Sequence, residues 1–428
     1  MRKKIAAFVL ILAANMGIAV LFRLSWQGWI VLCLVGGSLI PVLERIQKKV
    51  RADEKEYEEV TLYMEQVLCS YRRLHHLRSA WEDCLLLYEN GSPMGKAIAV
   101  ALNCLKSGES TADNKIVWNA CCKIHNNYNC ERLVLLHDFL CRTDKTGGDA
   151  EVAIDILLGD LQLWKRRKSL FHTREKIIKK ESTIAVFLSL AMCCFSCFMM
   201  PSDLAGQLIN SVWYQVSTVI VICLLMIVWM WIVHKLSRGW LDDVKCYSEN
   251  EQKKQYAILK SCSRGLKWYM AKKYCIREAE GEFSYWLLSV TLYLQQGSVY
   301  QALVESLGQI KGMFREEVAL LIQRVYDDPV SLVPYIDFFK ELEMEEIQSG
   351  MKLLYAAGNN EYRDVSRQIH ILVEQNNLIM DKFEQNRQDV KTAGMGVWKQ
   401  LPLLLAAVKV IIDMAILLVF TMERYSFW

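Results

Sequence analysis

Residues Trp213–His234 read WYQVSTVIVICLLMIVWMWIVH and contain no Lys, Arg, Asp or Glu. An apolar run of this length can cross a bilayer as a single helix, because about 20 helical residues span the hydrocarbon core. Other apolar stretches approach or reach the same length, at 5–22, 26–43, 183–200 and 401–421. The sequence therefore predicts an all-α, polytopic membrane protein with about five transmembrane helices.

The composition agrees with membrane spans that alternate with soluble segments. Of the 428 residues, 53% are hydrophobic and 23% are charged, so the apolar residues must be concentrated in some stretches. Only 6 prolines and 21 glycines occur, which favours long helices with short connections. The net charge of +4 gives no indication of nucleic-acid binding. The 15 cysteines are scattered through apolar segments, and we interpret them as reduced, buried thiols.

Basic residues near the ends of the spans predict their orientation, since Lys and Arg are retained on the cytoplasmic side. Arg2, Lys3 and Lys4 precede span 1, and Arg45, Lys48, Lys49 and Arg51 follow span 2. A cluster from Lys165 to Lys180 precedes span 3, and Lys235, Arg238 and Lys245 follow span 4. Arg23 is the only basic residue in the loop 23–25, and the loop 201–212 contains no Lys or Arg. We therefore expect a cytoplasmic N-terminus and two large cytoplasmic segments. Span 1 lacks a convincing signal-cleavage site and is predicted to stay in the membrane.

The predicted domains follow from these spans. They are an N-terminal transmembrane hairpin (1–44), cytoplasmic helical domain 1 (45–182), transmembrane helices 3 and 4 (183–234), cytoplasmic helical domain 2 (235–400), and a C-terminal transmembrane helix with a short outer tail (401–428). In domain 1 an apolar stripe at helical spacing includes Ala150, Ile154, Leu157 and Leu161. One apolar stripe per helix predicts a helical bundle.

The two cytoplasmic domains repeat an internal order, which indicates a duplication. An apolar helix, a Gly-Ser break and a second helix occur at Gly91-Ser92 and again at Gly297-Ser298. Gly tolerates the left-handed conformation at a helix end, and Ser can cap the next helix. Further on, Thr146-Gly147-Gly148 precedes an amphipathic helix and span 3, while Ala357-Gly358-Asn359 precedes a similar helix and span 5.

This order resembles the type II secretion system F domain, the family of inner-membrane platform proteins of type II secretion, type IV pili and Tad (Flp) pili. The resemblance covers about 55–200 and 265–421. It implies a scaffold in the bacterial inner membrane that couples a separate hexameric secretion ATPase to the extraction of pilin-like subunits and filament assembly. It also implies contacts with other inner-membrane assembly proteins, and a homo- or hetero-oligomer. The second copy departs from the first, because Ala357-Gly358-Asn359 replaces Thr-Gly-Gly.

Lys409 and Asp413 stand four residues apart near the middle of the last span. Charges at this depth are costly unless they face protein or a cavity, and an i,i+4 pair can neutralise itself on one helix face. Two interpretations are open: an ion pathway, or a polar patch that packs helices together. The first supports an alternative function as a membrane transporter or ion-coupled membrane protein, and a membrane-anchored signalling receptor is a third hypothesis.

Other chemically suggestive groups have ordinary explanations. The CxxC pattern Cys194–Cys197 lies within span 3, where small polarizable side chains suit a helix interface. Cys121, Cys122, His125 and Cys130 match no common zinc spacing. The cluster of Arg72, Arg73, His75, His76 and Arg78 is expected on a helix, as a solvated face or a docking patch for an acidic partner. No phosphate-binding loop, nucleophile elbow or metalloprotease signature occurs. We therefore predict a non-enzyme without cofactor or metal.

Overall fold

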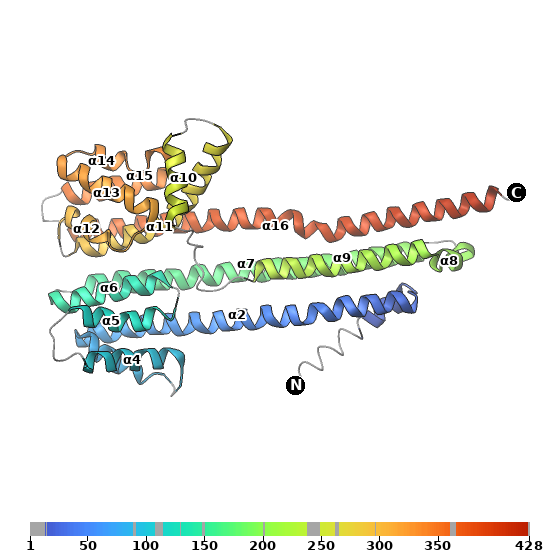
Figure 1. Cartoon of the computed structure of the whole chain (residues 1–428), viewed down its shortest axis with the longest axis horizontal. Coiled ribbons are helices and arrows are strands. Elements are labelled where there is room, and N and C mark those ends of the chain that lie inside the picture. Colours follow the sequence, from blue (N-terminus) through green and yellow to red (C-terminus); the bar gives the residue numbers. More distant parts are fainter. Residues whose placement is uncertain are drawn as a thin grey trace. The chain divides into compact units, whose positions relative to one another are not determined.

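The structure is a computed structural model that describes residues 13, 15–88, 91–107, 114–128, 130–147, 150–199, 202–237, 249–261, 265–295, 297–359 and 365–426 (Figure 1). Every regular element within these residues is a helix, so the prediction of an all-α protein is confirmed. The chain divides into two compact units. We call residues 1–54, 168–239 and 388–428 the membrane unit, and residues 55–167 and 240–387 the helical unit.

Three long helices contribute residues to both units. These are α2 (Trp26–Leu74), α7 (Glu151–Phe198) and α16 (Val365–Ser426), all visible in Figure 1. Each begins or ends with an apolar segment and continues as an amphipathic helix. The bilayer favours such continuity, because a backbone that leaves the helical conformation in lipid loses hydrogen bonds that no water replaces.

The membrane unit is built from the apolar parts of these helices together with α8 (Ser202–Ile209) and α9 (Val212–Leu236). Among the described residues, four helices are long and apolar enough to cross a membrane, at 26–74, 151–198, 212–236 and 398–422. They correspond to the second to fifth predicted spans. The first predicted span, 5–22, lies mostly outside the described residues.

Large apolar side chains on these helices point outward. Phe187 on α7, Trp213 on α9 and Ile411 on α16 are each about two-thirds to three-quarters exposed. An aqueous protein rarely leaves so much apolar surface uncovered on four neighbouring elements, whereas lipid covers it without cost. The exposed apolar surface therefore agrees with a membrane protein.

The short connections of the membrane unit are joined by one side chain. The Gln215 side chain accepts a hydrogen bond from Ser25 N at 2.9 Å and donates to the carbonyl oxygens of Arg23 at 3.1 Å and Ile209 at 2.7 Å. Arg23 and Ser25 lie between the first two predicted spans, and Ile209 ends α8. Gln215 thus satisfies backbone groups of two separate turns.

The first bundle of the helical unit consists of the later part of α2, α3 (Leu77–Leu85), α4 (Pro93–Ser107), α5 (Asn114–His125), α6 (Glu131–Thr146) and the early part of α7. Its core includes the predicted stripe, with Ala150, Ile154, Leu157 and Leu161 all buried. The amphipathic pattern of α7 is therefore explained by packing in this bundle.

The second bundle contains α10 (Glu249–Ser261), α11 (Leu266–Leu294), α12 (Val299–Ser306), α13 (Gly312–Asp327), α14 (Val333–Ile336), the 3₁₀ turn η1 (Lys340–Leu342), α15 (Glu345–Asn359) and the early part of α16. Aromatic rings dominate its core. Trp286 stacks on Phe338 with 5.4 Å between ring centroids and meets Phe314 edge-on at 5.5 Å. This aromatic core is distinct from the core of the first bundle.

The repeated Gly-Ser break is present in both bundles, with different geometry at the glycines. Gly91 has a φ of 115°, in the region that favours glycine, while Gly297 is not in that region. A Cβ at Gly297 would lie 2.7 Å from Oε1 of Gln301, the far end of a flexible side chain that can move aside, so the space there does not require glycine. Ser298 caps α12 by accepting a hydrogen bond from Gln301 N at 3.2 Å.

The glycines that precede the long helices also differ. Gly147 ends α6 in the left-handed conformation, with φ 63° and a hydrogen bond to Thr143 O at 2.9 Å. Thr146 is the last residue of α6, and Gly148 lies outside the described residues. Gly358 does not form a matching turn, because α15 continues through Asn359. A Cβ at Gly358 would come within 2.9 Å of Val299 Cγ2, so it allows α15 and α12 to approach.

A buried polar chain crosses the core of the first bundle. Tyr63 OH accepts a hydrogen bond from Trp81 Nε1 at 2.8 Å and lies 2.8 Å from His137 Nε2. The Nδ1 atoms of His137 and His125 are 3.3 Å apart. Burial, together with the neighbouring His125, lowers the pKa of His137 to about 3, so its ring is neutral at physiological pH.

We predict that acid destabilises the protein through His137. Its pKa in the folded state is about 3, below the ordinary value of 6.5. The stability that depends on neutral His137 is complete above pH 6.5 and is lost as the pH falls toward 3, by up to about 1.4 kcal/mol per pH unit. Thermal unfolding of the detergent-solubilised chain between pH 7.5 and 5 measures this slope. His137→Gln, which cannot titrate, should reduce it; an unchanged slope contradicts the assignment.

Candidate functional site

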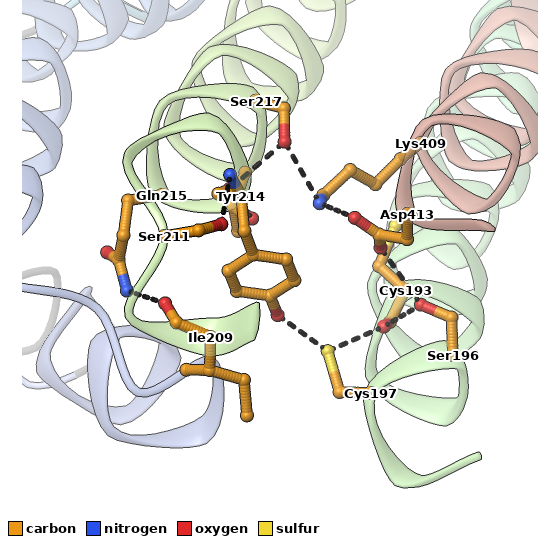
Figure 2. A network of polar contacts seen from close by, with 11 residues as sticks. Cys193, Ser196, Cys197, Ile209, Ser211, Tyr214, Gln215, Ser217, Lys409 and Asp413 are labelled. Carbon is orange, nitrogen blue, oxygen red and sulfur yellow. Dashed lines mark hydrogen bonds and ion pairs between the residues drawn. The ribbon is translucent and has the colours of Figure 1, made fainter. Parts of the chain in front are cut away.

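The apolar helices of the membrane unit bring polar side chains together at one place, shown in Figure 2. Ser196 comes from α7, Tyr214 and Ser217 from α9, and Lys409 and Asp413 from α16. The last two are 1% and 2% exposed. We call this group the membrane polar cluster.

Lys409 is the centre of the cluster. Its ammonium group forms an ion pair with Asp413, donates a hydrogen bond to Ser217 Oγ at 3.2 Å and lies 4.2 Å from the centroid of the Tyr214 ring. The carboxylate, the hydroxyl and the electron-rich ring face each compensate part of the desolvated charge. The ion pair that the sequence predicts is therefore formed, and α9 supplies the other two partners of Lys409.

Asp413 and the cysteines extend the cluster to α7. Asp413 Oδ2 accepts a hydrogen bond from Ser196 Oγ at 3.3 Å, and Cys197 Sγ lies 2.8 Å from Tyr214 OH (Figure 2). Cys197 Sγ also donates to Cys193 O at 3.3 Å. The CxxC pattern thus lies on a helix interface, as small polarizable residues in membrane helices often do.

The cluster links the three helices α7, α9 and α16. The opposite charges of Lys409 and Asp413 cancel, so the pair adds no net charge. Sliding α16 by one residue along α7 or α9 would move both charges about 1.5 Å and rotate them about 100° away from Ser196, Ser217 and Tyr214. The Lys409–Asp413 pair lies within α16 and would survive this shift. The register of these helices therefore depends on the hydrogen bonds to Ser196 and Ser217 and on the Tyr214 ring contact, which the shift would break.

Replacing Lys409 by Leu should destabilise the membrane unit by about 3 kcal/mol, because the Asp413 carboxylate then stays buried without its cation. The measurement is the thermal stability and the yield of monodisperse protein after detergent extraction. The double change Lys409→Leu with Asp413→Leu should recover most of the loss.

The matched control is Lys399→Leu. Lys399 also pairs with a carboxylate in the membrane unit, Glu181 at 2.5 Å, but its side chain is 31% exposed and that of Glu181 49% exposed. Water screens this pair, so its loss should cost less than about 1 kcal/mol. Equal stability of the Lys409→Leu protein and the control would refute a structural role for the buried pair.

A second candidate site is the interface between the two bundles of the helical unit. Asp138 of α6 accepts hydrogen bonds from Tyr293 OH of α11 at 2.5 Å and from Gln309 Nε2 at 2.9 Å. Arg142, one turn further on α6, pairs with Asp138 at 2.9 Å and with Glu305 of α12 at 2.7 Å. Its guanidinium lies 4.5 Å from the centroid of the Tyr293 ring.

Arg132 provides the other contact between the bundles. It is 4% exposed and pairs with Asp160 of α7 through Nε at 2.9 Å, while Nη1 donates to Tyr285 OH of α11 at 2.5 Å. The guanidinium lies between the rings of Trp164 and Tyr285, 4.9 and 4.7 Å from their centroids. Buried Arg and Tyr groups of this kind carry much of the energy of protein interfaces.

An acidic group lies near this interface. Burial raises the pKa of Glu282 on α11 to about 8, and the charges of Glu131 and Glu278 add to the shift. Its Oε2 atom is buried without a hydrogen-bond partner. Glu278 accepts a hydrogen bond from Gln252 Nε2 of α10 at 2.7 Å. Glu282 is therefore largely protonated at neutral pH.

Replacing Arg132 by Met should cost about 3 kcal/mol of unfolding free energy, because Asp160 keeps a buried, unpaired charge. Pulse proteolysis of the detergent-solubilised chain measures it. Arg73→Met is the control, since Arg73 pairs with Asp83 at 2.8 Å with its own side chain 67% exposed. A double-mutant cycle with Asp160→Asn should give a coupling energy above about 1.5 kcal/mol; additive effects would show that the pair is not coupled.

The remaining sequence candidates occupy ordinary positions. Cys121 Sγ lies 3.3 Å from Cys141 Sγ, and His125 adjoins His137. Within the part of the chain that the structure describes, no group of three or more His, Cys, Asp or Glu side chains could hold a metal ion.

The basic cluster does not lie on one helix, because α2 ends at Leu74 and α3 begins at Leu77. His75, with φ 51°, makes this break. The three arginines of the cluster are paired within the bundle, Arg72 with Asp155, Arg73 with Asp83 and Arg78 with Glu82. This pairing leaves less free positive charge for an acidic partner than the sequence suggests.

Several residues at these sites have only a weak signal in the sequence. Ser196, Ser217 and Tyr214 are ordinary members of apolar runs, and only the tertiary fold brings them to Lys409. Asp138 and Arg142 do stand four apart in helix α6, a spacing that could have indicated an ion pair. Arg132 and Tyr285 are far apart in the chain.

The chain was compared with models of protein families, with curated proteins and with solved structures, and none of the three comparisons found a match.

Proposed function

We propose that the chain is a platform protein of a pilus-assembly or type II secretion machine in the bacterial inner membrane. Its N-terminus and both bundles would lie in the cytoplasm and bind a hexameric secretion ATPase. Its membrane helices would guide pilin-like subunits during filament assembly, together with other inner-membrane assembly proteins and further copies of this chain.

The observation that supports this proposal best is the continuity of α7. Leu161 and Trp164 are buried in the first bundle, and Ile178 and Cys193 are buried in the membrane unit, all on one helix from Glu151 to Phe198. A helix is stiff along its axis. A displacement of the first bundle would therefore be passed along α7.

The second bundle has an equivalent connection through α16. Leu372, Ile379 and Phe383 pack in its core, and Ala406 is buried in the membrane unit. Lys409 and Asp413 lie further along this helix. Motion of either bundle would thus reach helices that share the membrane polar cluster. The sequence contains no nucleotide-binding loop, so the work would come from a partner.

A proline in the middle of α7 tests this coupling. Lys176 is exposed on α7 between the two cores, and Lys176→Pro removes the hydrogen bond to His172 O and kinks the helix. We expect the variant to insert and to bind the ATPase, while surface filaments are lost. The measurements are membrane insertion, co-purification with the ATPase and electron microscopy of filaments.

Lys176→Ala is the control, because it removes the same charge and keeps the helix. It should support normal filament assembly. Filaments that persist with Lys176→Pro would contradict rigid coupling through α7. Filaments that persist when the whole gene is deleted would contradict the platform proposal itself, since deletion of the ATPase gene and of this gene should give the same defect.

The second candidate function is an ion-coupled membrane protein, which the buried Lys409–Asp413 pair favours. Its charges have partners on α7 and α9, which suits packing better than transport. Proton or cation flux into liposomes that contain the purified chain, abolished by Asp413→Asn, would support this alternative over the platform.

A further inference from the structure

The segment between Glu251 and Glu278 is strongly basic. It contains eight Lys or Arg residues and no Asp or Glu; they are Lys253, Lys254, Lys260, Arg264, Lys267, Lys272, Lys273 and Arg277. The segment forms α10 and the start of α11. Tyr256 and Leu259 of α10 pack with Ala271 and Cys275 of α11 in the core of the second bundle, so the two helices form a hairpin.

The outer face at the start of α11 is apolar. Leu266, Tyr269 and Met270 lie at helical spacing and are 74%, 60% and 61% exposed. The opposite face, with Ala271 and Cys275, is buried. The first turn of α11 therefore has two apolar faces. One packs against the core of the bundle, and the other is exposed. An uncovered group of this kind usually marks a binding surface.

Cations surround this apolar turn. Lys267, Lys273 and Arg277 are exposed, and none of them has an ion pair with another described residue. Nearby cations are engaged, Lys260 with Glu317 at 2.5 Å and Lys272 with Glu343 at 2.6 Å. The partly buried Trp268 lies beside Lys272, whose Nζ is 5.1 Å from the centroid of its ring. Three exposed cations without an ion pair among the described residues, next to exposed apolar side chains, suit an anionic partner with an apolar layer.

The surface of an anionic bilayer fits this requirement better than an acidic protein. Tyr and Trp rings prefer the headgroup region, and Lys side chains extend through it to reach lipid phosphates. Six of the eight cations are Lys. Protein interfaces are depleted in Lys and enriched in Arg, so this composition favours lipid.

The length of the chain allows this contact. Helix α9 ends at Leu236 and α10 begins at Glu249. The connecting residues 237–248 can span up to ~40 Å when extended. Helix α10 is only ~20 Å long, so the hairpin tip can reach the bilayer that α9 enters.

We propose that the tip of the α10–α11 hairpin, formed by Leu266, Tyr269 and Met270 with Lys267, Lys273 and Arg277, binds the surface of an anionic bilayer. The second bundle then has a peripheral membrane contact in addition to its covalent connections. This inference is independent of the platform proposal, because it requires only that the hairpin faces a negatively charged leaflet.

Photocrosslinking of the full chain in nanodiscs tests the proposal. A benzophenone amino acid at Tyr269 reports which molecule covers the tip, and the same amino acid at Tyr326, which is 72% exposed on α13, is the control. We expect a lipid adduct at position 269, detected by mass spectrometry. Its yield should be at least about tenfold higher in nanodiscs that contain 30% phosphatidylglycerol than in pure phosphatidylcholine, since each cation near an anionic surface adds about fivefold to binding.

Charge variants complete the experiment. Lys267→Glu, Lys273→Glu and Arg277→Glu together should lower the adduct yield at least about tenfold, and the change should be smaller at high salt. The same number of charges reversed on the first bundle, at the exposed Lys96, Lys106 and Lys123, should leave the yield unchanged. Circular dichroism confirms that both variants are folded.

Three results would overturn the proposal. They are a lipid adduct of equal yield in neutral and anionic nanodiscs, no lipid adduct at position 269 in either, and an adduct to an added ATPase or pilin-like protein in place of lipid. The last result would assign the hairpin tip to a protein partner and leave the platform proposal standing.

Discussion

Inside lipid, every backbone amide and carbonyl group needs a hydrogen-bond partner within the protein. This constraint governs the architecture. A helix that enters the bilayer must satisfy its own hydrogen bonds, and the simplest way to connect a bundle to a span is to continue the same helix. Helices α2, α7 and α16 do so over 49, 48 and 62 residues. The bundles and the membrane unit consequently share elements, although each has its own buried core.

Polar contacts organise the places where these elements meet. In the membrane unit the Lys409–Asp413 pair joins three helices, and between the bundles Arg132 and Asp138 receive partners from both sides. Buried ion pairs add little net stability compared with apolar packing, but they penalise every arrangement that leaves a charge unpaired. The pairs that join different helices, such as Arg142 with Glu305, therefore specify one docking geometry between the bundles.

The sequence predicts the features that depend on local composition. Four of the five predicted spans coincide with described helices that are long and apolar enough to cross a membrane, and the first lies mostly outside the described residues. The stripe at Ala150–Leu161 marks a buried helix face correctly. Features that depend on tertiary contacts could not be predicted from the sequence. Gly358 was expected to correspond to Gly147, yet it lies inside α15 and packs against Val299. The break at His75 has no glycine or proline to indicate it.

The composition of α16 has a consequence for how the chain reaches its final fold. Lys and Asp near the centre of a span make it a poorer substrate for insertion than a wholly apolar helix, because an isolated charge there costs about 2.5–3.5 kcal/mol and their i,i+4 pairing offsets only part of this cost. The groups that compensate these charges, Ser196 and Ser217, belong to helices synthesised earlier. The C-terminal helix is therefore expected to leave the translocon only once α7 and α9 are paired beside it, so that its biogenesis depends on the order of synthesis.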